Sequence, residues 1–147
     1  MCLSLKPWAS ANNYVGQKFD IEWIVDDYDG LRIYMNNIHN PKNNIVLDTR
    51  NCTVCTYRSL NDLFTRIEEQ IYYKATDGES EKSTFFEVLD SSLVHDMQYW
   101  GLIGDHSAED YLHLVVLAGN SIFELVTFKQ PELRENANYC PPKYVSD

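Results

Sequence analysis

The chain has 147 residues, and its 22 acidic and 12 basic side chains give a formal net charge of −10 at pH 7. This excess of carboxylates disfavours non-specific binding to nucleic acid, because the phosphate backbone carries charge of the same sign. Hydrophobic residues make up 44% of the chain and aromatic residues 13%, a composition unlike that of a disordered protein. The length suits one globular domain over residues 1–147 that buries its own core.

The N-terminal residues do not form a signal-peptide pattern, because Lys6 and Pro7 interrupt the apolar run. The longest apolar run, residues 114–118, is far shorter than the roughly 20 residues that span a bilayer. We therefore expect a cytoplasmic protein that makes no membrane contact and whose four cysteines are reduced thiols.

Four strands are predicted in the first part of the chain. Apolar and polar residues alternate over residues 19–26, which is typical of a half-buried strand, and Asp29-Gly30 suits a tight turn into a second strand over residues 31–35. Residues 45–47 and 52–57 predict two more strands. We expect all four to join one antiparallel sheet, in which the first strand buries Phe19, Ile21, Trp23 and Val25.

Two helices are predicted in the middle of the chain. Ser59 is a favourable N-cap, and the apolar residues that follow it recur at helical spacing: Leu60, Leu63, Phe64, Ile67 and Ile71. This pattern predicts the longer helix. A shorter helix is predicted to be capped by Asp90-Ser91-Ser92 and to run through Tyr99 or Trp100.

The remaining predicted elements are strands. Residues 84–89 predict one strand, residues 110–118 and 121–128 predict a closing hairpin, and the tail from about residue 131 is expected to be irregular. The predicted fold is α+β, a single domain whose mostly antiparallel sheet of about six to seven strands carries one long and one short helix. The predicted core contains Trp23, Ile33, Leu63, Phe64, Ile67, Leu114, Val116 and Phe123.

Cys52 and Cys55 have the C-x-x-C spacing of zinc and redox sites. The residues around them favour extended structure, in which the two sulfurs point to opposite faces of a strand. Cys2 and Cys140 are isolated near the ends of the chain, so they do not supply the second ligand pair that zinc requires. We therefore predict no metal and no cofactor.

Three histidines lie among aspartates in one segment: His95, His106 and His113 beside Asp96, Asp105 and Asp110. Their spacings match no metal-binding motif, and His113 alternates with leucines on a predicted strand, a position typical of a buried, hydrogen-bonded histidine. A G-x-S-x-G motif does not occur, which does not exclude a Ser/His/Asp arrangement, and the sequence singles out no catalytic residue. The alternative hypothesis is a small metal- or acid/base-dependent hydrolase that uses residues 95–113.

Charge is the most informative feature of the sequence. Between Lys82 and Lys129 the chain has no Lys or Arg but seven carboxylates: Glu87, Asp90, Asp96, Asp105, Glu109, Asp110 and Glu124. A field of one sign favours the approach of a partner of the opposite sign. The predicted contacts with such a partner are Asp105, Glu109 and Asp110, with Tyr99 and Trp100 as aromatic anchors and the acidic turn at Asp26, Asp27 and Asp29 as a second patch.

These features fit the physical profile of a non-catalytic acidic binding protein. We expect an inhibitor that covers a basic protein, as bacterial immunity proteins do for nuclease toxins, because complementary charge speeds association and aromatic side chains supply affinity. A second alternative is an assembly or regulatory subunit, which would use the same aromatic surfaces in a homo-oligomer. Nucleic acid and membranes are not expected partners.

Overall fold

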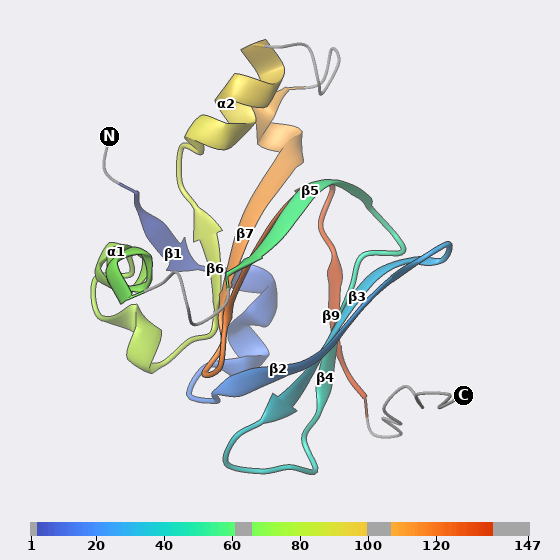
Figure 1. Ribbon diagram of the computed structural model, residues 1–147, viewed down its shortest axis with the longest axis vertical. Coiled ribbons are helices and arrows are strands. Elements are labelled where there is room, and N and C mark those ends of the chain that lie inside the picture. Colours follow the sequence, from blue (N-terminus) through green and yellow to red (C-terminus); the bar gives the residue numbers. More distant parts are fainter. Residues whose placement is uncertain (1–2, 61–65, 100–106, 137–147) are drawn as a thin grey trace.

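The computed structural model describes residues 3–60, 66–99 and 107–136, and they form two antiparallel sheets that pack face to face (Figure 1). The five-stranded sheet contains, in spatial order, β1 (Leu5–Pro7), β6 (Phe85–Val88), β7 (Tyr111–Leu117), β8 (Ile122–Phe128) and β5 (Thr53–Leu60). The four-stranded sheet contains, in spatial order, β2 (Phe19–Asp27), β3 (Gly30–Asn37), β4 (Ile45–Asp48) and β9 (Glu132–Glu135).

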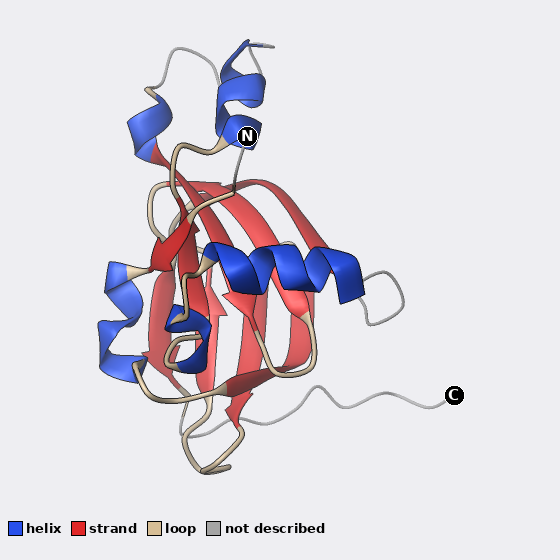
Figure 2. Cartoon of the chain, turned by 90° about the vertical axis from the view of Figure 1, so that its left-hand side faces the viewer, coloured by secondary structure: helices blue, strands red, loops and turns tan. Residues whose placement is uncertain are grey.

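Helices are few and lie outside the sheets. The α-helices are α1 (Arg66–Ala75) and α2 (Ser92–Tyr99), and the short 3-10 helices are η1 (Ala9–Tyr14), η3 (Glu79–Glu81) and η4 (Ala108–Asp110). Figure 2 shows α1 lying across the outer face of the five-stranded sheet. In the described part of the chain no helix is long and apolar enough to cross a membrane.

The α+β class and the antiparallel pairing are confirmed, but the predicted single sheet of about six to seven strands is only roughly right, because the described strands form two sheets of five and four strands. The four strands from β2 to β5 do not stay together, because β5 pairs with β8 instead of β4. The turn after β4 explains the separation: the backbone N–H and the hydroxyl of Thr49 both donate to the carbonyl of Leu31, at 3.1 and 2.6 Å. The N–H of Cys52 then donates to the carbonyl of Thr49, which turns the chain out of the four-stranded sheet.

The main core lies between the two sheets, and a second apolar layer lies outside the five-stranded sheet. Along β7 and β8, successive side chains point alternately to the main core and to the outer layer. Both strands are therefore nearly continuous apolar sequences, as expected for strands covered on both faces. Facing the other sheet are Phe85, Leu112, Leu114, Val116, Phe123 and Leu125. Facing outward with Tyr72 of α1 are Phe86, Val88, Val115, Leu117 and Ile122.

A bulge in β2 overturns the prediction that Trp23 belongs to the core. Ile21 pairs with Met35 but Trp23 pairs with Tyr34, so Glu22 is an extra residue in the ladder. An extra residue turns every later side chain to the opposite face of the sheet. Consequently Trp23 lies on the face opposite to that of Ile21. Ile24 shares the face of its partner Ile33, but its side chain is 38% exposed and does not join the core.

Of the other predicted core residues, Ile33, Leu114, Val116 and Phe123 lie in the main core as expected. Leu63, Phe64 and the side chain of Ile67 lie outside the described residues.

The longer helix is also placed differently from the prediction. Ser59 and Leu60 are strand residues that pair with Phe123 and Ile122, so Ser59 is not an N-cap. In α1 the side chain of Ile71 is 52% exposed, whereas Tyr72 is buried against the sheet. The helix therefore presents its tyrosines to the core, and the apolar spacing predicted from Leu60 onward does not mark its buried face.

Four further predictions concern the second half of the chain. The strand now labelled β6 and the β7–β8 hairpin are confirmed. The α2 helix is confirmed as well, with Ser91 as its cap, while Trp100 lies outside the described residues. The expectation of an irregular tail from residue 131 is wrong in part, because β9 pairs with β4.

Candidate functional site

A hollow of about 590 Å³ lies where β6 meets α2 and η4, and we call it the acidic hollow. It is lined by Glu87, Val88, Leu89, Asp90, Ser91, Val94, His95, Gln98, Ser107, Glu109, Tyr111 and His113. All of these residues come from the segment that contains no Lys or Arg. The lining therefore has three carboxylates and no permanently charged basic side chain. A cationic group is the ligand that such a lining favours.

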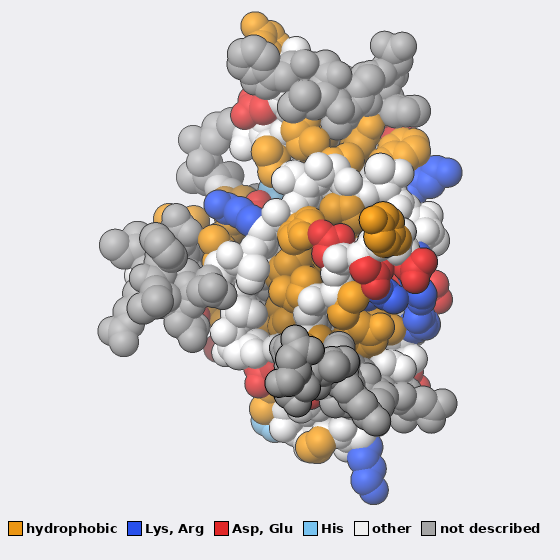
Figure 3. Space-filling model, turned by 45° about the vertical axis from the view of Figure 1, so that its right-hand side comes forward, with side chains coloured by type: hydrophobic (Ala, Val, Ile, Leu, Met, Phe, Trp, Pro, Cys, Tyr) orange, Lys and Arg blue, Asp and Glu red, His pale blue; other side chains and the backbone are white. Residues whose placement is uncertain are grey.

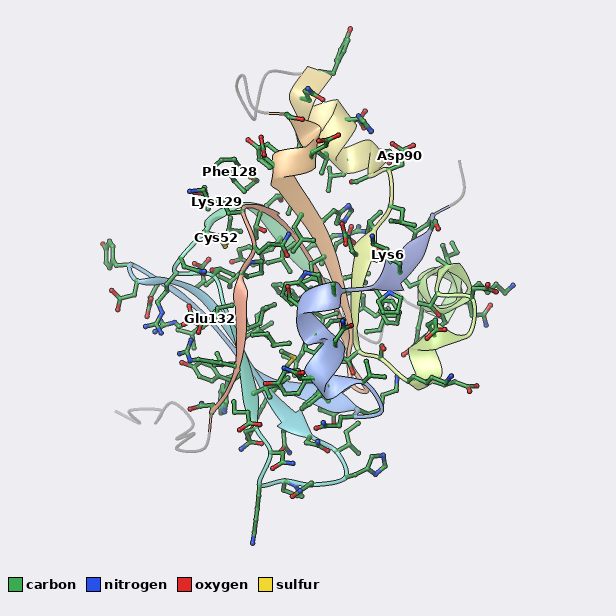
Figure 4. The ribbon with its side chains drawn as sticks, turned by 180° about the vertical axis from the view of Figure 1, so that it is seen from behind. Lys6, Cys52, Asp90, Phe128, Lys129 and Glu132 are labelled. Atoms are coloured by element: carbon green, nitrogen blue, oxygen red, sulfur yellow. The ribbon has the colours of Figure 1, made fainter. Side chains whose placement is uncertain are left out.

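The turn between β6 and α2 shapes this hollow. The backbone N–H of Leu89 donates to the carbonyl of Ser4, and Asp90 has a left-handed φ of 48°. Ser91 then accepts the N–H of Val94 on its hydroxyl at 3.1 Å, which caps α2. The Asp90 carboxylate is 2.8 Å from Nε2 of the exposed His95 one turn later. Figure 4 shows Asp90 at the start of α2 and Lys6 on the neighbouring β1.

The absence of basic residues along the segment does not mean that all its carboxylates lack basic neighbours in space. Lys6 of β1 lies 3.8 Å from Glu87, and Arg58 of β5 donates to Glu124 at 3.0 Å. Both partners reach the segment because β1 and β5 pair with its strands. Among the described residues of the segment, the exposed carboxylates that remain are those around α2 and η4: Asp90, Asp96, Glu109 and Asp110.

The structure brings together only part of the predicted contact surface. Glu109 and Asp110 are exposed on η4, and Glu109 lines the acidic hollow. Tyr99 lies at the end of α2 with its side chain 83% exposed. Trp100 and Asp105 lie outside the described residues.

The second predicted patch is at the tip of the β2–β3 hairpin, which lies away from α2 (Figure 1). Asp27 pairs with Arg32 at 2.5 Å. Asp26 accepts the Tyr57 hydroxyl at 2.5 Å, and this hydrogen bond raises the pKa of Tyr57. Figure 3 shows acidic and basic side chains gathered together on the right of the molecule. Two of the three predicted carboxylates, Asp26 and Asp27, are therefore already engaged by the protein's own side chains.

The histidines do not converge on one point. His95 is exposed, His106 lies outside the described residues, and His113 is buried on the outer face of β7. Nδ1 of His113 is 2.6 Å from the Ser91 hydroxyl, and Nε2 is 2.5 Å from a carboxylate oxygen of Glu124. Within the described residues no group of three or more His, Cys, Asp or Glu side chains could hold a metal ion.

Glu124 is the centre of a buried polar cluster on this face. Its other carboxylate oxygen accepts the hydroxyl of Tyr72 at 2.6 Å and Nε of Arg58 at 3.0 Å. Burial alone would raise the pKa of Glu124, but the hydrogen bonds from His113 and Tyr72 and the charge of Arg58 outweigh it and lower the pKa to about 2. Burial and the Glu124 carboxylate raise the pKa of Tyr72 to about 12. Glu124 is therefore ionised at neutral pH.

Of the two cysteines of the C-x-x-C pattern, Cys55 lies in β5, where the ladder is irregular between Val54 and Thr56, and Cys52 lies in the turn just before this strand. Burial raises the pKa of Cys52 to about 11 and also raises the pKa of Cys55. Thiolate is the reactive form of cysteine, so both side chains should be poor nucleophiles at neutral pH.

We therefore expect iodoacetamide at pH 7.5 to alkylate Cys52 at least about 10-fold more slowly in the native protein than in the urea-unfolded protein. Peptide mass spectrometry gives the rate at each cysteine separately. Equal rates in the two states would show that the Cys52 thiol is not protected.

The sequence reasoning did not identify Glu124, Tyr72 and Arg58 as a group, and it treated Ser91 only as a helix cap. One signal was present, because Glu124 lies at an outward position of β8 between the apolar residues Ile122 and Val126. A charged residue at such a position implies a buried partner.

Comparisons of the chain with protein-family models, with curated proteins and with solved structures find no match.

Proposed function

We propose that this protein binds a basic protein partner at the acidic hollow and acts as its inhibitor. The observation that supports this proposal is the lining itself, in which Glu87, Asp90 and Glu109 surround a space with no Lys or Arg. A volume of about 590 Å³ is large enough for at least one Lys or Arg side chain of the partner. The net charge of −10 would speed the encounter.

The partner class that fits best is a basic enzyme, such as a nuclease toxin, whose substrate-binding surface is positively charged because it binds phosphates. An acidic inhibitor that covers this surface excludes the substrate. Asp90 and Glu109 would receive the cationic side chains, and Tyr99 at the end of α2 would supply an aromatic contact.

The test uses charge reversal with a matched control. Glu109→Lys combined with Asp110→Lys changes the net charge by +4 next to the hollow, and Glu79→Lys with Glu81→Lys makes the same change on the exposed η3. Tagged wild-type protein is used to capture a partner from the native host, and binding of the identified partner is measured at several salt concentrations. We expect the first pair to slow association by at least about 10-fold at 0.15 M salt and the control pair to have a much smaller effect.

Two results would contradict this function. The captured partner could be acidic or a nucleic acid. Alternatively, the two variant pairs could bind the partner with the same rates and the same salt dependence, which would show that only the total charge matters and not the hollow.

A further inference from the structure

Ser91, His113 and Glu124 form one continuous hydrogen-bonded chain at the edge of the acidic hollow. The Ser91 hydroxyl is 2.6 Å from Nδ1 of His113, and Nε2 of the same ring is 2.5 Å from Glu124. We propose that Ser91 is a nucleophile for acyl transfer from esters that carry a positive charge, with His113 as its general base and Glu124 as a positioning residue. This activity shares the acidic hollow with the proposed binding function but does not depend on it.

The hydrogen-bond pattern assigns each proton in the chain. Ionised Glu124 can only accept hydrogen bonds, so Nε2 of His113 carries the proton that lies between them. In the neutral ring Nδ1 is then an acceptor, and the Ser91 hydroxyl must donate to it. The hydroxyl oxygen also accepts the N–H of Val94. His113 is thus held in the tautomer that can remove the hydroxyl proton of Ser91.

The backbone around Ser91 supports the same role. Ser91 stands at a strand-to-helix turn between β6 and α2, and Asp90 immediately before it has a left-handed φ of 48°. A non-glycine residue in this conformation is strained, and such strain clusters at functional sites. Serine nucleophiles of hydrolases occupy comparable sharp turns at the start of a helix.

The start of α2 also provides donors for a developing negative charge. The Ser91 hydroxyl accepts a hydrogen bond from the N–H of Val94, and the Ser91 carbonyl accepts one from the N–H of His95. Within the described part of the chain, the N–H groups of Ser92 and Leu93 make no hydrogen bond. Backbone N–H groups next to a nucleophile are the donors that stabilise the oxyanion of an acyl-transfer intermediate.

Access and charge define the substrate class. Ser91 and His113 line the acidic hollow, and both also line a neighbouring cavity of about 300 Å³ on the side of Leu3 and Leu89. The acidic hollow would hold a cationic group near Asp90 and Glu109, while the apolar side chains would hold a short acyl or alkyl part. An anionic ester would be repelled by the same carboxylates.

The reaction balances without a cofactor. The Ser91 oxygen bonds to the ester carbonyl carbon while its proton moves to Nδ1 of His113. The carbon–oxygen bond to the leaving alcohol then breaks, and that proton goes to the alcohol. A water molecule then attacks the carbonyl carbon of the acyl-serine and gives a proton to the same nitrogen. The bond between that carbon and the Ser91 oxygen breaks, the carboxylic acid is released, and Nδ1 of His113 returns the proton to the Ser91 oxygen.

The test uses three p-nitrophenyl esters as probes: the cationic 4-guanidinobenzoate, the neutral acetate and the anionic hemisuccinate. We expect a burst of p-nitrophenol with the cationic ester and an acyl group on Ser91 by peptide mass spectrometry, with rates in the order cationic, neutral, anionic. Ser91→Asn keeps a helix cap but removes the hydroxyl, and His113→Gln removes the base, so each should lower the acylation rate at least about 100-fold. Ser10→Ala, at an exposed serine of η1 that lines neither cavity, should leave the rate unchanged.

Near-UV circular dichroism checks that each variant is folded, and Glu124→Asp should keep more of the acylation rate than Glu124→Gln if the carboxylate positions His113. The inference is overturned if folded wild-type protein shows no acyl group on Ser91. It is also overturned if His113→Gln is acylated at the wild-type rate, which would leave Ser91 and His113 with the structural role of fixing α2 to the sheet. Both outcomes are read without any protein partner, so they are separate from failure of the binding proposal.

Discussion

Replacing Phe123 with alanine is expected to lower the free energy of unfolding by about 3–5 kcal/mol. Phe123 lies on the inward face of β8 with its side chain fully buried between the two sheets. Its ring also stacks on Tyr57 of β5, with ring centroids 5.6 Å apart and planes 21° apart. Removing the ring leaves a cavity that two packed sheets cannot close, and it also removes the support of an edge strand.

Phe128→Ala on the same strand is the matched control. Phe128 is only partly buried at the end of β8, where the centroid of its ring is 5.4 Å from that of the Tyr111 ring. Its loss should therefore cost about half as much or less. Urea unfolding followed by circular dichroism measures both variants, and equal losses would show that the space between the sheets is not the main core of the protein.

Local elements of the fold could be predicted because each depends on residues close in sequence. The β2–β3 hairpin follows from alternation and from Asp29-Gly30, and Gly30 indeed has a left-handed φ of 125°. Helix α2 follows from its cap at Ser91. The division into two sheets depends instead on long-range contacts, such as the hydrogen bonds from Thr49 to Leu31 and the pairing of β5 with β8. Nothing in the local pattern of residues 45–60 specifies which strand β5 will join.

The charges of the candidate site also depend on contacts between residues that are far apart in the sequence. The lining of the acidic hollow comes entirely from residues 83–128, which contain no Lys or Arg, because β6, α2 and η4 are neighbours in space. The segment could not show that β1 and β5 bring Lys6 and Arg58 to two of its carboxylates. It also could not show that Ser91 and Glu124, which are 33 positions apart in the chain, meet the same imidazole ring.

Glu124→Gln is expected to lower the free energy of unfolding at pH 7 by about 3 kcal/mol, because it removes the buried negative charge that accepts hydrogen bonds from His113, Tyr72 and the largely exposed Arg58. Urea unfolding at a series of pH values also tests the pKa. The folded pKa of Glu124 is about 2, below its ordinary value of 4.5, so ionised Glu124 stabilises the fold above about pH 4.5. This contribution, about 3 kcal/mol by linkage, should be lost as the pH falls from 4.5 toward 2.

The difference between wild-type protein and Glu124→Gln isolates this residue from other acidic groups. Asp48 also has a lowered pKa, because hydrogen bonds from Arg50 and Arg134 outweigh its burial, but both proteins contain it and its effect cancels. The difference should therefore narrow by most of its value between pH 5 and pH 2. Glu87→Gln is the control, since Glu87 meets Lys6 at 3.8 Å on the partly exposed surface and should cost less than about 1 kcal/mol at any pH. If the difference in free energy of unfolding between the wild-type protein and Glu124→Gln stays constant from pH 5 to pH 2, Glu124 has an ordinary pKa in the folded protein. Its contacts with His113 and Tyr72 would then stabilise the fold through packing and not through charge.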